Sequence, residues 1–178
     1  MSKYPTRRQT PPRRTLLLGG LTLALSACGF QPRGMVELPP VMQRVHLGGH
    51  RADHGLAGAL ARLVQQNGGE MVSDARAASL RLTILHEQTN RREAVIDPRA
   101  RLRELELIQR VVLKAEDAQG AVLLKNESFE ATRMMHYDPL NLLGQGEEEA
   151  RLRSEMQETL AQAIFARLRS LANAQNRP

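Results

Sequence analysis

Apolar and polar residues alternate along four stretches of the chain, which is the pattern of strands that bury one face. Leu80, Leu82 and Ile84 show the alternation clearly, with Arg81 and Thr83 between them. Sequences rich in Asp, Gly and Pro separate the stretches and suit turns. We therefore expect one short and three long strands, over residues 41–47, 80–96, 102–116 and 121–137.

The last of these strands changes its apolar phase part-way. Val122 and Leu124 occupy even positions, whereas Phe129, Ala131 and Met135 occupy odd ones. Successive side chains of a regular strand point to opposite faces, so both groups can face one core only if an extra residue lies between them. The sequence therefore predicts a β-bulge in this strand.

Residues 54–67 repeat apolar side chains every three or four positions, as in a helix that buries one side. Asp53 is the expected N-cap. The helix should stop at Asn67-Gly68-Gly69, because Asn and Gly tolerate the left-handed conformation.

A second helix, of about 25 residues, is predicted from the spacing of Leu152, Met156 and similar residues. We expect it to begin at Glu147–Glu149, where the helix dipole favours negative charge, after a flexible segment at 144–146. Residues 173–178 are expected to be a polar tail.

This order of elements predicts an α+β fold in which both helices pack on one face of the sheet. The domain is placed at 41–172. Residues 28–40 contain several prolines, which favour extended backbone, and are expected to form a tether.

Residues 1–27 have the layout of a secretion signal. Basic residues precede an apolar run of about ten residues, which is half the length that a helix needs to cross a bilayer. The run ends at Leu25-Ser26-Ala27-Cys28, which resembles the lipobox of bacterial lipoproteins. The resemblance implies cleavage before Cys28, an S-diacylglycerol on its sulfur and acylation of its new amino group. The alternative is an ordinary signal peptide followed by a stray cysteine. No cofactor other than this lipid is expected.

The basic excess of the chain comes from its leader. Five of the 25 Lys and Arg residues lie within the first 15 positions, which leaves 20 against 19 acidic residues and a net charge of +1. A near-neutral domain without Trp argues against a nucleic-acid partner.

Catalytic patterns are missing from the sequence, so we expect no enzyme activity. Cys28, the only cysteine, is assigned to lipid. His46, His50 and His54 are spaced by four, but Gly48-Gly49 would interrupt a helix that aligned them. Surface histidines are therefore favoured over a metal site.

The order of features along the mature chain resembles the LptE family of lipopolysaccharide-assembly lipoproteins. The matching features are Cys28-Gly29-Phe30, Asn67-Gly68 after the first helix, Ser79-Leu80-Arg81-Leu82, Arg133 before Tyr137-Asp138-Pro139, and the long last helix. Pro32 departs from the family, in which leucine is common.

The resemblance implies a function as well as a fold. Members sit on the periplasmic side of the outer membrane by their lipid anchor, form a 1:1 complex with the LptD β-barrel, plug it and assist its assembly. The complex delivers lipopolysaccharide to the outer leaflet. The alternative is a periplasmic lipoprotein that binds a lipid or another ligand on its own.

Five arginines surround the expected tip of the first long hairpin: Arg91, Arg92, Arg99, Arg101 and Arg103. Guanidinium groups bind phosphates through two parallel bonds. We therefore expect this tip to contact lipopolysaccharide or an acidic part of the barrel. The alternative is a solvated hairpin end whose charges prevent edge pairing.

Overall fold

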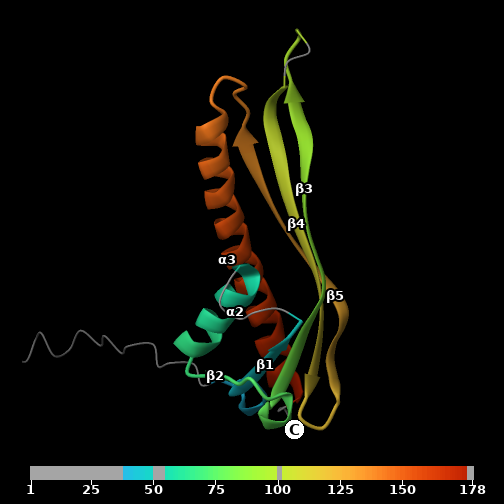
Figure 1. The fold of residues 1–178 in the computed structure, drawn as a ribbon. Coiled ribbons are helices and arrows are strands. Elements are labelled where there is room, and N and C mark those ends of the chain that lie inside the picture. Colours follow the sequence, from blue (N-terminus) through green and yellow to red (C-terminus); the bar gives the residue numbers. More distant parts are fainter. Residues whose placement is uncertain (1–37, 50–54, 100–101, 176–178) are drawn as a thin grey trace, which may run out of the picture. The chain divides into compact units, whose positions relative to one another are not determined.

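The computed structural model describes residues 38–49, 55–99 and 102–175. Within this part of the chain, five strands form one sheet in the order β2-β1-β3-β4-β5 (Figure 1). The strands are β1 (Arg44–Gly48), β2 (Glu70–Met71), β3 (Leu80–Ile96), β4 (Leu102–Asp117) and β5 (Val122–His136). The four predicted strands are confirmed. β2 has only two residues, too few to show a periodicity in the sequence.

Several expectations concern residues outside the described part. They are the signal peptide, Cys28, most of the tether, the Asp53 cap, His50, His54 and Arg101.

A β-bulge divides β3 into two parts. Ile84 pairs with Leu113 of β4, but the next pair is His86 with Val112, so Leu85 is an extra residue on β3. The bulge exchanges the faces of β3. Even-numbered side chains face the core before it, and odd-numbered ones share the helix-covered face after it as far as Glu93, beyond which the register shifts again. The sequence analysis missed this bulge, because the residues beyond it are polar and show no change of apolar phase.

A second bulge, in β5, confirms the one predicted. Leu113 pairs with Glu127, whereas Ala115 pairs with Leu124, so β5 has one residue more than β4 between these pairs. Asn126 lies there with φ of 54°, in the left-handed region that Asn tolerates better than most residues. The two bulges therefore flank β4 at the same level, around Leu113. We call the strand segments beyond them (residues 85–96, 102–112 and 127–136) the arm, and the rest of the sheet the base.

Both α-helices of the described residues, α2 (Gly55–Gln66) and α3 (Leu142–Gln175), cover one face of the sheet, as predicted. Val45 and Leu82 of the sheet meet Leu60 of α2 and Phe165 and Leu168 of α3. The unfilled space among these side chains is about 10 Å³, less than one water molecule needs. This part of the core is therefore well filled and has no room for a ligand.

The end of α2 follows the sequence prediction. The N–H of Gly69 donates to the carbonyl of Val64 at 2.9 Å, and the Asn67 side chain donates to the carbonyl of Leu63 at 2.8 Å. Gly68, with φ of 85°, takes the left-handed conformation that closes a helix.

The predicted start of α3 is wrong. The helix has 34 residues and begins at Leu142, so Gly144–Gly146 are helical rather than flexible and Glu147–Glu149 lie beyond the first turn. The physical reason is a local cap: the side-chain oxygen of Asn141 accepts from the Gly144 N–H at 3.1 Å.

The predicted end of α3 is also too early. The helix continues to Gln175, so residues 173–175 of the predicted polar tail are helical. Ala172 is 2% exposed, which shows that the helix still packs on the core near this end. The first part of α3 runs beside the end of β5 (Figure 1), whereas its later turns pack on β1 and β3.

Candidate functional site

Of the predicted arginines, Arg91, Arg92 and Arg103 lie on the arm and bind carboxylates, and Arg99 lies in the turn that follows β3. Nε of Arg92 donates to Oε2 of Glu106 on the neighbouring strand at 2.7 Å. Nη2 of Arg103 lies 3.0 Å from Oδ2 of Asp97. Arg99 donates its backbone N–H to the Asp97 carboxylate at 2.9 Å, which shapes the turn. The two guanidinium groups are thus compensated locally, and both stay largely exposed.

The Arg91 side chain extends from β3 to the helix α3. Its Nε donates to Oε1 of Glu149 at 3.0 Å, and its Nη2 lies 2.7 Å from Oε2. Arg153, one turn further along α3, binds the same carboxylate. The Glu149 side chain is 10% exposed, so a largely buried carboxylate joins β3 to α3.

A second polar position lies inside the arm. Gln109 of β4 is 2% exposed and donates from Nε2 to Glu87 at 2.8 Å. Its Oε1 is buried and has no hydrogen-bond partner. A buried carbonyl without a partner is costly, so the helix-covered face of the arm is less purely apolar than that of the base.

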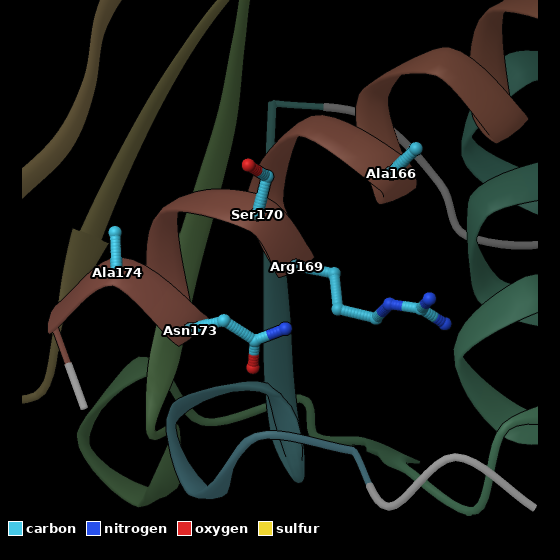
Figure 2. Close-up of a pocket in the computed structure, with 5 residues that line it drawn as sticks. All are labelled: Ala166, Arg169, Ser170, Asn173 and Ala174. Atoms are coloured by element: carbon cyan, nitrogen blue, oxygen red, sulfur yellow. The ribbon is translucent and has the colours of Figure 1, made fainter. Parts of the chain in front are cut away.

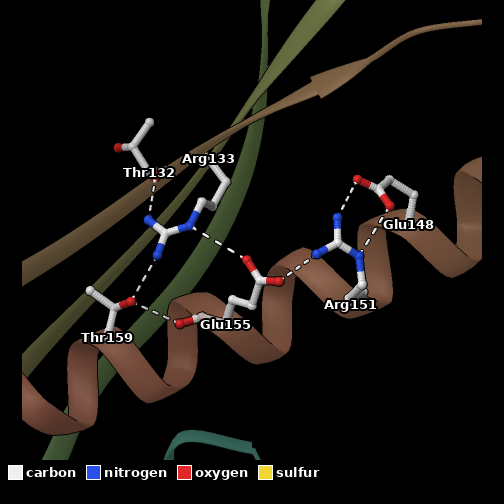
Figure 3. A network of polar contacts seen from close by, with 6 residues as sticks. All are labelled: Thr132, Arg133, Glu148, Arg151, Glu155 and Thr159. Atoms are coloured by element: carbon white, nitrogen blue, oxygen red, sulfur yellow. Dashed lines mark hydrogen bonds and ion pairs between the residues drawn. The ribbon is translucent and has the colours of Figure 1, made fainter.

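Polar contacts also connect β5 to α3 (Figure 3). Arg133 donates to Thr159 at 2.9 Å, and its Nε lies 3.8 Å from the Glu155 carboxylate. Arg151 binds both Glu155 and Glu148. The hydrogen bond to Glu148 raises the pKa of Arg151, and the charges of Glu148 and Glu155 raise it further. Because all these groups are partly exposed, the contacts position α3 more than they stabilise it.

A shallow pocket of about 380 Å³ lies on the last turns of α3 (Figure 2). Its lining is Ala166, Arg169, Ser170, Asn173 and Ala174. These side chains offer hydrogen bonds and one positive charge but no general base next to the hydroxyl, so the pocket has no nucleophile activated for catalysis.

Metal-binding groups and membrane-spanning helices were sought among the described residues. These residues contain no group of three or more His, Cys, Asp or Glu side chains placed to hold a metal ion. None of the helices in this part of the chain is long and apolar enough to cross a membrane.

Comparison with protein families identifies the chain. The model of the LptE family, described as lipopolysaccharide-assembly, matches residues 37–168. The chain belongs to the LptE family. The match covers β1 to most of α3 and so includes the arm and the base. LptE-family proteins are lipoproteins of lipopolysaccharide assembly. A search of curated proteins found no match.

Solved structures agree with the LptE assignment. Uncharacterized lipoprotein B from Nitrosomonas europaea is 26% identical, with a TM-score of 0.67 over 82% of this chain and 94% of that one. Two others share the fold. Rare lipoprotein B from Shewanella oneidensis is 20% identical, with a TM-score of 0.60 over 74% of this chain and 96% of that one. A minor lipoprotein from Acinetobacter baumannii is 22% identical, with a TM-score of 0.59 over 75% and 93%.

The sequence pointed to Arg91 but not to its partner, Glu149. Glu149 and Arg153 are four residues apart, which on a helix predicts an ion pair. The contact with Arg91, 58 residues earlier in the chain, has no local signal, since it depends on how the arm lies against α3.

Proposed function

We propose that this LptE-family chain is an outer-membrane lipoprotein that plugs the LptD β-barrel in a 1:1 complex and assists its assembly. The complex would deliver lipopolysaccharide to the outer leaflet. The observation that carries the proposal is the family match over residues 37–168.

The uncovered face of the sheet suits such a partner. Odd-numbered residues of β4 from Leu107 to Ala115 are buried on the helix-covered side, so its even-numbered residues point to the other face. Charged pairs on that face include Arg110 with Glu130, Arg92 with Glu106 and Lys114 with Glu116. Barrel lumens are polar, and a surface of paired opposite charges can pack against such a wall without a large net charge.

Anchoring is assigned to Cys28. An S-diacylglycerol and an N-acyl chain together hold a protein on a membrane, which one chain alone does only marginally. Cells labelled with radioactive palmitate should incorporate it into wild type and not into Cys28→Ala. Equal incorporation into both would contradict the anchor.

The partner is tested by mild detergent extraction of membranes followed by affinity purification of this chain. We expect a large β-barrel protein in 1:1 amount, identified by mass spectrometry. A lone monomer that carries bound lipid would instead support the stand-alone ligand-binding lipoprotein. The space among the core side chains between α2, α3 and the sheet is too small to hold a ligand for that alternative.

We further assign lipopolysaccharide or barrel contact to the five arginines that the sequence places around the hairpin tip, Arg91, Arg92, Arg99, Arg101 and Arg103. Their guanidinium groups suit the phosphates of lipid A. Replacement of all five by Ser should abolish lipopolysaccharide binding by the purified domain, and unchanged affinity would remove this part of the proposal.

A further inference from the structure

An open cleft of about 230 Å³ lies where the arm meets the first turns of α3. Its walls are Arg91, Gly146, Glu149, Ala150 and Arg153. Gly146 and Ala150 are one turn apart on the helix and carry almost no side chain, which leaves the space empty. A water molecule occupies roughly 30 Å³ in the liquid, so the cleft has room for a polyatomic anion and part of its hydration shell.

Positive charge exceeds negative charge in this cluster. The guanidinium groups of Arg91 and Arg153 both bind the single carboxylate of Glu149. The Glu149 side chain is 10% exposed, whereas those of Arg91 and Arg153 are 58% and 44% exposed. The two cations therefore remain open to solvent on the side of the cleft, while the anion that neutralises one of them lies beneath.

The contact between Arg91 and Glu149 has the geometry of ligand recognition. Two nitrogens of one guanidinium face two oxygens of one carboxylate, at 3.0 and 2.7 Å. Arginine binds external carboxylates and phosphates through the same pair of bonds. Glu149 thus occupies the position that an incoming anion would take.

A second glutamate on α3, Glu155, also binds two arginines but differs from Glu149 in burial and geometry. Glu155 also receives one arginine from a strand, Arg133, and one from the helix, Arg151. However, Glu155 is 45% exposed and lies 3.8 Å from the Arg133 Nε. It is also not part of the wall of the cleft. Of these two glutamates, only Glu149 is largely buried, accepts two bonds from one guanidinium group and borders the cleft.

We propose that the cleft is an anion site whose arginines are occupied by Glu149 until an external phosphate group displaces its carboxylate. Displacement replaces the bonds between Arg91 and Glu149 by bonds between Arg91 and phosphate, and so removes the ion pair that joins the arm part of β3 to α3. The inference deepens the proposed function and rests on it for the source of the anion, because Arg91 belongs to the arginines assigned there to lipopolysaccharide.

Titration of the purified chain with inorganic pyrophosphate, followed by calorimetry, tests the site. Glu149→Gln keeps the shape of the side chain and removes its charge, so it should bind pyrophosphate about tenfold tighter or more, as expected for the loss of a competing anion at hydrogen-bond distance. Adding Arg91→Gln to this variant should abolish the gain. The matched control Glu155→Gln should stay within about twofold of wild type, because its ion pairs are exposed.

Two results would overturn the site: equal affinity of Glu149→Gln and wild type, or a gain that survives Arg91→Gln. If Glu149→Gln does not fold, Arg153→Gln replaces it. That variant keeps the bond between Arg91 and Glu149 but removes the excess charge, so it should lose the pyrophosphate binding of wild type, and retained binding would overturn the site.

Vesicles distinguish the sources of the phosphate. Binding of Glu149→Gln to phosphatidic acid vesicles but not to phosphatidylcholine vesicles, with competition by pyrophosphate, assigns the site to a lipid headgroup. Binding of pyrophosphate alone assigns it to a free anion. These experiments use the chain without its barrel, so copurification of wild type with the barrel tests the proposed function separately.

Discussion

One strand, β3, crosses from the base to the arm and is buried very differently in each. Leu80, Leu82 and Ile84 are 1–5% exposed under the two helices. Beyond the bulge at Leu85, every side chain from Gln88 to Ile96 is exposed. The strand pairs with β4 throughout, so the backbone hydrogen bonds are alike. The difference lies in what covers the strand.

Buried side chains and exposed ion pairs contribute very differently to the stability of β3. Full burial of one Leu or Ile contributes about 1.5–3 kcal/mol, whereas an exposed ion pair contributes about 0–1 kcal/mol. The β3 part of the arm is joined to α3 by the ion pair of Arg91 and Glu149. We infer that burial stabilises β3 in the base, whereas polar contacts position β3 in the arm. The other two strands of the arm keep buried side chains such as Leu107 and Met135.

Removing apolar volume from the base should have the largest effect. Leu82→Ala creates a cavity beneath both helices and should lower the free energy of unfolding by about 2–5 kcal/mol. Ile96, on the same strand but in the arm, is 55% exposed, so Ile96→Ala should cost less than about 0.5 kcal/mol. Urea unfolding of the two variants gives the measurement. Equal losses would show that the difference in burial along β3 does not determine its contribution to stability.

A smaller effect is expected at the β5 bulge that separates the two parts. Asn126 has φ of 54°, and a β-branched residue cannot adopt this conformation without strain. Asn126→Val should therefore destabilise the fold by about 1–2 kcal/mol, while Asn126→Gly should be neutral or slightly stabilising. Ser128→Val, at a regular exposed position of the same strand, is the control and should cost nothing. If both Val variants behave alike in thermal unfolding, the bulge is not under conformational constraint.

The base was predictable from the sequence because its patterns are local. Leu80, Leu82 and Ile84 alternate within one strand, and Asn67-Gly68 ends α2 through bonds within the same turn. The bulge in β5 could be predicted because apolar residues stand on both sides of it. The bulge in β3 could not, because its arm side is polar.

The candidate site was only half predictable for the same reason. Arg91 stood out as one of several arginines near a hairpin tip, but its partner Glu149 was assigned to a helix start. The true start depends on Asn141, whose side chain caps the helix at Gly144. Two glycines in the first turns made the segment look flexible, whereas in the fold Gly146 forms one wall of the cleft.

The smallest effect is expected for the contacts that connect the arm to α3 at β5. Arg133→Ala removes the bonds to Thr159 and Glu155, and because these groups are partly exposed it should cost less than about 1 kcal/mol. Hydrogen exchange should nevertheless rise in β5 beyond the bulge and in the first half of α3, and stay unchanged in α2. In wild type, 1 M salt shortens the screening length from about 10 Å at 0.1 M to about 3 Å and should produce the same pattern. Uniform exchange across base and arm would mean that burial, rather than charge, holds the arm in place.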